Sequence, residues 1–365
     1  MGFKCGIVGM PNVGKSTLFN ALMQTVVAEA ANYPFCTIEP NIGEISVPDQ
    51  RLTKLAKIAN STQIIPARLT FVDIAGLVRG ASNGEGLGNQ FLAHIREVDA
   101  IIYVLRCFDN VDVTHIEGRI DPTDDADIVE TELMLADLES LEKRQSALEK
   151  KARNNDKDAK LTLELIDKAL SLLRAGKPAR MAELTPDEEG PWKKLHLLTS
   201  KPVLYVCNVD EDSAFRGNDY TNKVEAKALA ENAGHIIISA KIEAELTLLD
   251  NIERDEFLET MGLKEPGLNR LIRKGYEILG LLTYFTVGPK ETRAWTIVTG
   301  TKAPQAAGII HTDFERGFIR AETVNFKDFV LQNGEAGCKE NGKMRLEGKD
   351  YVIQDGDVVH YRFAT

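Results

Sequence analysis

The chain has 365 residues, of which 43% are hydrophobic and 27% are charged, and its formal net charge is −11. This composition is that of an ordinary globular protein with two or three domains. The negative charge excludes a surface that binds phosphate backbones along its whole extent, so any contact with nucleic acid needs a local basic patch.

The cysteines argue against a disulfide framework and against a zinc site. They are odd in number, widely spaced and without a C-x-x-C pair: Cys5, Cys36, Cys107, Cys207 and Cys338. No apolar run approaches the length of a membrane span, and no secretory signal precedes the first motif. We therefore expect a cytoplasmic protein with no membrane partner.

Short apolar runs predict the buried strands of one sheet. Helical stretches separate several of them, which favours an α/β fold with a mostly parallel sheet. We expect residues 1–127 and 201–279 to form this nucleotide-binding domain. The predicted strands are FKCGIV, NIGEISV, ARLTFVD, DAIIYVLRCF, KPVLYVCN and GHIIISA.

Residues 128–200 interrupt the alternation with a heptad-like pattern. Two groups of residues at spacings of three and four predict two antiparallel helices in a coiled-coil hairpin, inserted between two strands of the sheet. Two ordinary surface helices lying on the sheet are the alternative. The first group is Met134, Leu138, Leu141, Gln145, Leu148 and Ala152, and the second is Leu163, Ile166, Leu170 and Leu173.

Residues 280–365 change character again. Strand-like runs such as LLTYFTV, RAWTIVTG and DYVIQDGDVVHYRF alternate with glycine-containing turns, which predicts a small β-rich domain.

The motif GMPNVGKST, Gly9–Thr17, follows the first predicted strand and opens a helical stretch, which is the context of a phosphate-binding P-loop. Its glycines let the backbone curl so that successive N–H groups point at phosphate oxygens, beside the positive end of a helix dipole. We expect Lys15 to reach the β and γ phosphates and the Ser16 hydroxyl to ligate Mg²⁺. The residues predicted to bind the nucleotide here are Gly9, Asn12, Val13, Gly14, Lys15, Ser16 and Thr17.

Two further segments supply candidate groups around the metal and the γ phosphate. Asp73–Gly76 ends a predicted strand and fits D-x-x-G, in which Asp73 approaches Mg²⁺ through water and the Gly76 N–H senses the γ phosphate. Thr37, in NYPFCTIEPN, is the candidate second hydroxyl on Mg²⁺. Alone, D-x-x-G recurs by chance, and its position downstream of a P-loop strand gives it weight. On sequence alone, Thr37 is best explained as a threonine in a polar loop.

The segment VLYVCNVDED carries the candidate base-reading motif N-x-x-E, from Asn208 to Glu211. Guanine readers have N-K-x-D, whose Asp accepts two hydrogen bonds from the guanine edge. Here Glu211 is longer by one methylene, and Val209 replaces a Lys whose stem would cover the base. A site without the paired guanine contact loses its strong discrimination, so the sequence predicts relaxed base specificity. Asn208 remains able to bond the ring edge, and Ser239-Ala240-Lys241 resembles the S-A-K loop that touches the exocyclic position.

These motifs follow one another in the order of translation-factor-like P-loop GTPases. With GFKCGIVGMPNVGKSTLFNAL, NYPFCTIEPN, FVDIAGLVRGAS, GEGLGNQFL and HTDFERGFIRAETV, the chain resembles the YchF/Obg-like ATPase family over essentially its whole length. The resemblance implies a P-loop NTPase with a Ras-like G domain, the coiled-coil insertion, and a C-terminal ubiquitin-like β-grasp called TGS. It also implies ATP preferred over GTP, and the ribosome (70S and large subunit) or its RNA as partner through the insertion and the TGS surfaces.

Three residues near the expected phosphates have open roles. Leu77 stands where Ras-like proteins carry the Gln that orients the attacking water, so hydrolysis is expected to be slow; it is equally compatible with a packed residue beside the loop. Asn12 is a candidate K⁺ ligand, or a brace of the loop. His115 is a candidate catalytic residue in a loop that could face the phosphates, although most lone histidines are structural or solvated.

The sequence thus predicts a Mg²⁺-dependent ATPase, with K⁺ as a candidate second ion, that acts as a nucleotide-state switch on the ribosome. A GTPase of translation or ribosome assembly is one alternative, disfavoured by Glu211. A ribosome- or RNA-binding adaptor whose hydrolysis is incidental is the other. Sequence-specific DNA binding is not expected.

Overall fold

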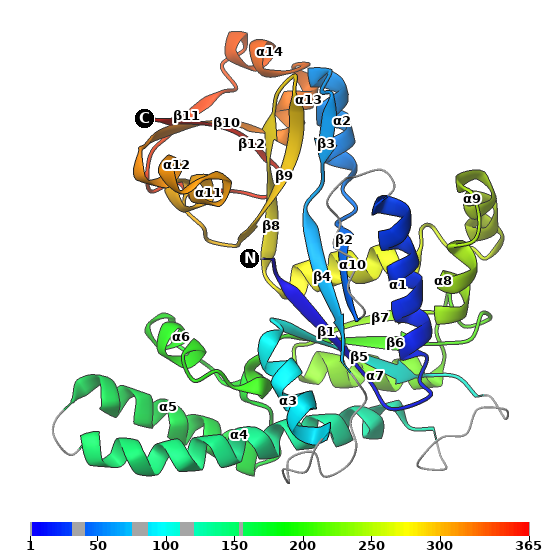
Figure 1. Ribbon diagram of the computed structural model, residues 1–365, viewed down its shortest axis with the longest axis vertical. Helices are drawn as coiled ribbons and strands as arrows, with labels where there is room; N and C mark the ends of the chain where they lie inside the picture. Colours follow the sequence, from blue (N-terminus) through cyan, green and yellow to red (C-terminus); the bar gives the residue numbers. More distant parts are fainter. Residues whose placement is uncertain (1, 31–40, 75–86, 110–119, 153–155, 365) are drawn as a thin grey trace. The chain divides into compact units, whose positions relative to one another are not determined.

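The computed structural model describes residues 2–30, 41–74, 87–109, 120–152 and 156–364 (Figure 1). They form two compact units. The first unit is Met1–Glu44 with Thr70–Leu271, and the second unit is Ile45–Leu69 with Ile272–Thr365. Ile45–Leu69 and the residues from Ile272 to 279 therefore group with the C-terminal part of the chain, whereas the sequence suggested that they belong to the nucleotide-binding domain.

A six-stranded sheet with the order β2-β4-β1-β5-β6-β7 lies at the centre of the first unit. The pairs β1–β4, β1–β5, β5–β6 and β6–β7 are all parallel, as the apolar runs predicted. Every residue of β5 and β6 is buried, which explains why these strands read as continuous apolar runs. The strands are β1 Lys4–Val8, β2 Ile42–Ser46, β4 Arg68–Asp73, β5 Ala100–Arg106, β6 Val203–Asn208 and β7 Gly234–Ile238.

Helices connect these strands, so that the carboxyl ends of the parallel strands meet at one edge of the sheet. Helix α7 begins at an Asn218 cap whose side chain accepts hydrogen bonds from Tyr220 N and Thr221 N. Helix α8 begins at Ser239 in the same way, through Ile242 N. The helices between strands are α1 Lys15–Ala30, α3 Leu87–Glu97 and α7 Asp219–Ala230, and those that follow β7 are α8 Ala240–Leu246, α9 Asn251–Thr260 and α10 Gly267–Ile278. The residues of α10 from Ile272 onward belong to the second unit.

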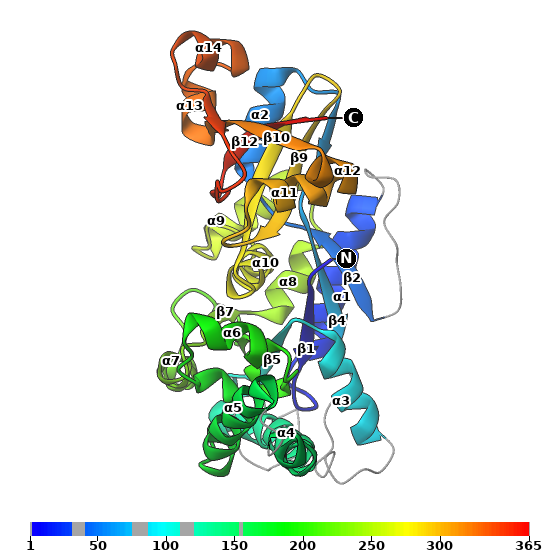
Figure 2. The ribbon, with the colours of Figure 1, turned by 90° about the vertical axis from the view of Figure 1, so that its left-hand side faces the viewer.

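A helical insertion between β5 and β6 is present, as predicted. Helices α4, Pro122–Ala152, and α5, Lys157–Arg174, pack side by side in both views (Figures 1 and 2). A short helix α6, Pro186–Lys193, follows. The buried cluster of the insertion comprises Leu141, Leu165, Ile166, Ala169, Leu170, Leu173, Ala179, Trp192, Leu195 and Leu197.

The buried face of α5 is wider than the predicted seam. Leu165 and Ala169 belong to the buried cluster and Leu163 does not, because Trp192 and Leu197 from the segment after α5 pack against the hairpin as well. A helix that contacts more than one neighbour needs an apolar stripe broader than a coiled-coil seam.

The second unit contains a six-stranded mixed sheet with the order β11-β10-β12-β8-β9-β3. Tyr284 and Ala307 are fully buried in its core. The strands are β3 Gln63–Ile65, β8 Leu281–Val287, β9 Glu291–Val298, β10 Phe318–Asn325, β11 Arg345–Glu347 and β12 Asp357–Phe363. The helices are α2 Gln50–Ala59, α11 Ala303–Ile310, α12 Thr312–Arg316, α13 Phe326–Leu331 and α14 Glu335–Glu340.

Strand β3 explains why Ile45–Leu69 belongs to the second unit. It pairs in parallel with β9, with Gln63 opposite Glu291, and the Ser61 hydroxyl donates to Gly288 O at 2.7 Å. In the described part of the chain, no helix combines the length and the apolar character needed to cross a membrane.

Candidate nucleotide-binding site

The P-loop runs from the end of β1 to the start of α1, and its backbone is shaped by glycines where the motif requires them. Gly14 has φ +91°, and a Cβ there would lie 2.1 Å from Asn208 Nδ2. A Cβ on Gly9 would lie 2.7 Å from Val104 O. Side chains at these two positions would strain or displace the loop, so the curled backbone depends on both glycines. Asn12 adopts a left-handed conformation with φ 63°, which asparagine tolerates better than most residues.

Lys15 and Asp73 are brought together at the carboxyl edge of the sheet. Lys15 Nζ donates to Asp73 Oδ1, and the side chains are 12% and 17% exposed. Ser16 and Thr17 are exposed at the start of α1. Three residues predicted to hold phosphate or metal (Lys15, Ser16 and Asp73) thus come from two strand ends that are distant in sequence.

Asn208 is buried and ties the P-loop to the candidate base-reading loops. Its Nδ2 donates to Val13 O at 2.8 Å, and its Oδ1 accepts from Ala240 N at 2.9 Å. The same side chain therefore holds both the loop after β1 and the loop after β7. In this structure Asn208 acts as a brace, and the Ala240 N–H is engaged by it.

Glu211 and Lys241 form an ion pair at the other end of the N-x-x-E and S-A-K motifs. Lys241 Nζ donates to Glu211 Oε1, and the side chains are 67% and 36% exposed. This hydrogen bond lowers the pKa of Glu211 and raises the pKa of Lys241 from their ordinary values. Val209 and Ser239 are buried, and Ser239 caps α8. The N-x-x-E and S-A-K motifs therefore lie next to each other. The acceptor Glu211 and the donor Lys241 are paired, and both are accessible to a ligand.

Two contacts beside the candidate base-reading loop had not been predicted. Cys107 N donates to Asn208 O at 2.8 Å, and Asn218 Nδ2 donates to Cys107 O at 2.7 Å. The N-x-x-T pattern at Asn218 signals a helix cap. This pattern does not predict the hydrogen bond with Cys107, because the two residues become neighbours only in the folded protein.

Several predicted site residues lie outside the described residues. These are Thr37, Gly76, Leu77 and His115. Their roles stay predictions.

Elsewhere among the described residues, one further group has carboxylate and imidazole atoms close enough for a metal ion: Glu322, Glu335 and His360, in the second unit. Glu322 accepts from Arg362 at 2.9 Å, and Lys339 pairs with Glu335 at 2.7 Å. Because the carboxylates already have cationic partners, this group is best described as an ion-pair cluster.

Known proteins with this arrangement cover the whole chain. Residues 4–127 match the model of a 50S ribosome-binding GTPase. Residues 281–364 match the model of the C-terminal domain of YchF GTPases, described as a protein of unknown function. A protein of Haemophilus ducreyi named "Ribosome-binding ATPase YchF" is 55% identical over 363 residues, covering 100% of this chain and 99% of the relative. The chain belongs to the YchF family.

Two other YchF proteins extend this likeness. The Bacillus subtilis protein, also named "Ribosome-binding ATPase YchF", is 53% identical over 365 residues and 100% of both chains. The structure of the Schizosaccharomyces pombe YchF GTPase superposes with a TM-score of 0.89 at 39% identity, covering 99% of this chain and 98% of that one. The YchF resemblance read from the sequence is therefore confirmed, with the G-type domain and the YchF C-terminal domain both present.

Proposed function

We propose that this YchF-family chain is a Mg²⁺-dependent ATPase that hydrolyses ATP slowly and binds the ribosome. The observation that carries the proposal is the P-loop cradle, in which Gly9 and Gly14 leave no room for a side chain and Asn208 fixes Val13. Relatives named ribosome-binding ATPases match this chain from end to end and support both parts of the proposal.

The phosphate end of the site uses groups that already lie together. On nucleotide binding, Lys15 would exchange the Asp73 carboxylate for β and γ phosphate oxygens, and Asp73 would then be available to hold the metal through water. Ser16 and Asp73, with Thr37, offer the oxygen donors that Mg²⁺ prefers. When bound, Mg²⁺ neutralises part of the phosphate charge. Gly76 N–H would sense the γ phosphate.

Slow turnover follows because Leu77 cannot orient the attacking water. We propose that a K⁺ ion held by Asn12, or the His115 side chain, supplies part of what the missing Gln would do. Equal ATP turnover in K⁺ and in Na⁺ would rule out the first of these.

The base end of the site favours adenine. A guanine reader needs an acidic side chain free to accept two hydrogen bonds, whereas Glu211 here already accepts from Lys241. Guanine would compete with Lys241 for Oε1 of Glu211, whereas adenine has no 2-amino donor that requires this acceptor. ATP is therefore preferred over GTP.

The charges of the two units support a ribosomal partner that meets the second unit. This unit carries 17 Lys and Arg against 13 Asp and Glu, whereas the first unit carries 27 against 42. Only the second unit has the positive balance that attracts an RNA backbone. We infer that it is a ubiquitin-like β-grasp of the TGS kind, because α11 packs into the core of a mixed sheet. A ribosomal partner would place the protein's action in the cytoplasm.

A hollow of about 810 Å³ in the second unit offers a specific contact for RNA. The rings of Phe314 and Phe363 stack there with centroids 3.9 Å apart, beside His311, Asp313 and Arg316. Aromatic rings next to a guanidinium are typical of sites that stack unpaired bases. The insertion is the second proposed contact surface.

The experiment that tests the proposal measures ATP and GTP affinity and turnover, with and without ribosomes, for the wild-type chain and for Lys15→Ala. We expect ATP to bind more tightly than GTP, and Lys15→Ala to reduce turnover by about 10²–10³-fold, the usual effect of losing one donor to developing charge. Lys143→Ala, which breaks an exposed pair with Glu139 in the insertion, is the matched control for affinity and turnover without ribosomes. Tenfold tighter GTP binding would show a GTPase instead, and ribosome binding that survives complete loss of turnover would favour the adaptor.

A further inference from the structure

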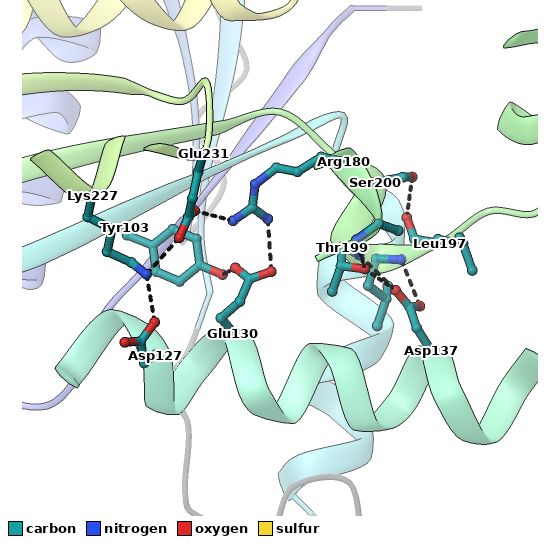
Figure 3. Close-up of polar contacts among 12 residues, drawn as sticks. Tyr103, Asp127, Glu130, Asp137, Arg180, Leu197, Thr199, Ser200, Lys227 and Glu231 are labelled. Carbon is teal, nitrogen blue, oxygen red and sulfur yellow. Dashed lines mark hydrogen bonds and ion pairs between the residues drawn. The ribbon is translucent and has the colours of Figure 1, made fainter. Parts of the chain in front are cut away.

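A network of charged and phenolic side chains lies where the insertion joins the sheet (Figure 3). Arg180, in the 3₁₀ turn Ala179–Met181 that follows α5, donates through Nη1 to Glu130 at 2.8 Å and through Nη2 to Glu231 at 2.7 Å. Glu130 belongs to α4, and Glu231 caps the end of α7. One guanidinium therefore connects two segments of the insertion to a helix that packs on the sheet.

The same carboxylates hold the two central strands. Tyr103 on β5 donates to Glu130 Oε2 at 2.9 Å, and Tyr205 on β6 donates to Glu231 Oε2 at 2.8 Å. Burial raises the pKa of both tyrosines, so their hydroxyls remain protonated donors. The network thus has Arg180 at its centre and one strand at each end.

These strands lead to the proposed nucleotide site. Tyr103 lies opposite Tyr205 in the sheet register, and further along the same strands Arg106 lies opposite Asn208. With a rise of about 3.3 Å per residue, the two tyrosines lie about 10 Å along the strands from Asn208, on its N-terminal side. Asn208 in turn holds Val13 of the P-loop. A shift of either strand along or across the sheet therefore reaches the phosphate-binding loop.

The base of the insertion is stiffened by a second buried carboxylate. Asp137 on α4 accepts from Leu198 N and Thr199 N at 2.9 Å each, and from the Thr199 hydroxyl at 2.7 Å (Figure 3). These residues precede β6. Helix α4 is therefore held at two points along its length, Glu130 and Asp137.

We propose that Arg180 is a positioning residue that couples the helical insertion to β5 and β6, so that nucleotide binding and the insertion influence each other. Arg180 suits this role because its side chain is only 9% exposed and its planar fork spans two carboxylates at once. A lysine at this position keeps the charge but reaches one partner at a time. The inference rests on the proposed nucleotide binding. It adds the contacts through which that binding would influence the insertion.

The test compares amide hydrogen exchange in α4 and α5 of the full chain with and without saturating ATP. In the wild type, ATP changes exchange rates near Glu130 by about fivefold or more, the lower end of usual coupling between sites. Arg180→Lys and the double variant Tyr103→Phe with Tyr205→Phe reduce this response to less than about twofold. The double variant removes only two hydroxyls and keeps every charge, so it tests the inference even where Arg180→Lys folds poorly.

Arg174→Lys is the matched control, because Arg174 joins α5 to Glu142 on α4 by an exposed pair. It retains the wild-type response. A merely structural Arg180 would lower the melting temperature yet leave the ATP-dependent exchange difference intact, and that result overturns the inference. So does ATP binding by the wild type with no change in α4. Absence of ATP binding would instead contradict the proposed function, and the same comparison is then made with GTP.

Discussion

The candidate nucleotide site and the base of the insertion both contain ion pairs, but of two different kinds. At the candidate nucleotide site, Lys241 and Glu211 form a pair whose side chains are 67% and 36% exposed. At the base of the insertion, Arg180 and Glu130 form a pair whose side chains are 9% and 5% exposed. The first kind remains in contact with water, and the second has lost it.

This difference separates contacts that a ligand can replace from contacts that hold the fold. An exposed pair contributes little and exchanges partners readily, as a site that must accept phosphates or a base requires. A buried pair that loses one partner leaves a charge without compensation, which is strongly destabilising. The Lys15–Asp73 pair lies between these extremes, with 12% and 17% exposure, next to the loop where phosphate would compete for Lys15.

The largest effect is expected where a buried pair is broken. Arg180→Met leaves Glu130 and Glu231 without their shared cation, and we expect a loss of about 3–5 kcal/mol in the free energy of unfolding. Chemical denaturation of the full chain measures this. The exposed counterpart Arg174→Met should change stability by less than about 1 kcal/mol. Equal losses in the two variants would remove the distinction between the two kinds of pair.

Two features of the first unit could be predicted from the sequence alone. The P-loop was predictable because phosphate binding demands Gly9, Gly14 and Lys15 at fixed spacing, and the parallel strands were predictable because burial on both faces leaves an apolar run. The site roles of these residues stay predictions, while the structure places them around one edge of the sheet. Asn208 was identified as a motif residue, but its partners Val13 O and Ala240 N become neighbours only in the folded sheet.

Other features had no local signal at all. Arg180 acquires its role from four elements that meet at the base of the insertion, and nothing in the sequence around it distinguishes it from a surface arginine. Strand β3 pairs with β9 across more than half of the chain, so Ile45–Leu69 appeared to belong with its sequence neighbours. Long-range pairing of this kind leaves no periodicity that a single sequence can display.

An effect of intermediate size is expected from the pH dependence of stability at the buried carboxylate Glu231. Burial opposes ionisation of Glu231, but hydrogen bonds from Lys227 and Arg180 outweigh it and lower the pKa of this carboxyl. A lowered folded-state pKa contributes stability above the ordinary value near 4.5, and this contribution is lost as the pH falls through the folded-state pKa. Glu231→Gln should therefore cost about 1.5–3 kcal/mol at neutral pH.

Thermal unfolding at pH 7.5 and at pH 4 and below checks this. We expect the wild type to lose its advantage over Glu231→Gln as the solution is acidified. Glu142→Gln, which breaks the exposed pair with Arg174, provides the control and should track the wild type at both ends of the range. A gap between wild type and Glu231→Gln that stays constant with pH would mean that Glu231 is not held ionised by its partners.

The smallest effect is expected at the exposed pair, and it concerns base choice rather than stability. Lys241→Met keeps much of the aliphatic stem but releases Oε1 of Glu211, so that this oxygen can accept from the guanine edge. We expect GTP affinity to rise by about two- to fivefold, the scale of an exposed ion pair, with ATP affinity nearly unchanged. Competition between the two nucleotides for the full chain measures the ratio, and Lys143→Met breaks a similarly exposed pair far along the insertion as control. An unchanged ratio would show that Lys241 does not occupy Glu211 in the bound state, and base choice would then depend on the length of the Glu211 side chain itself.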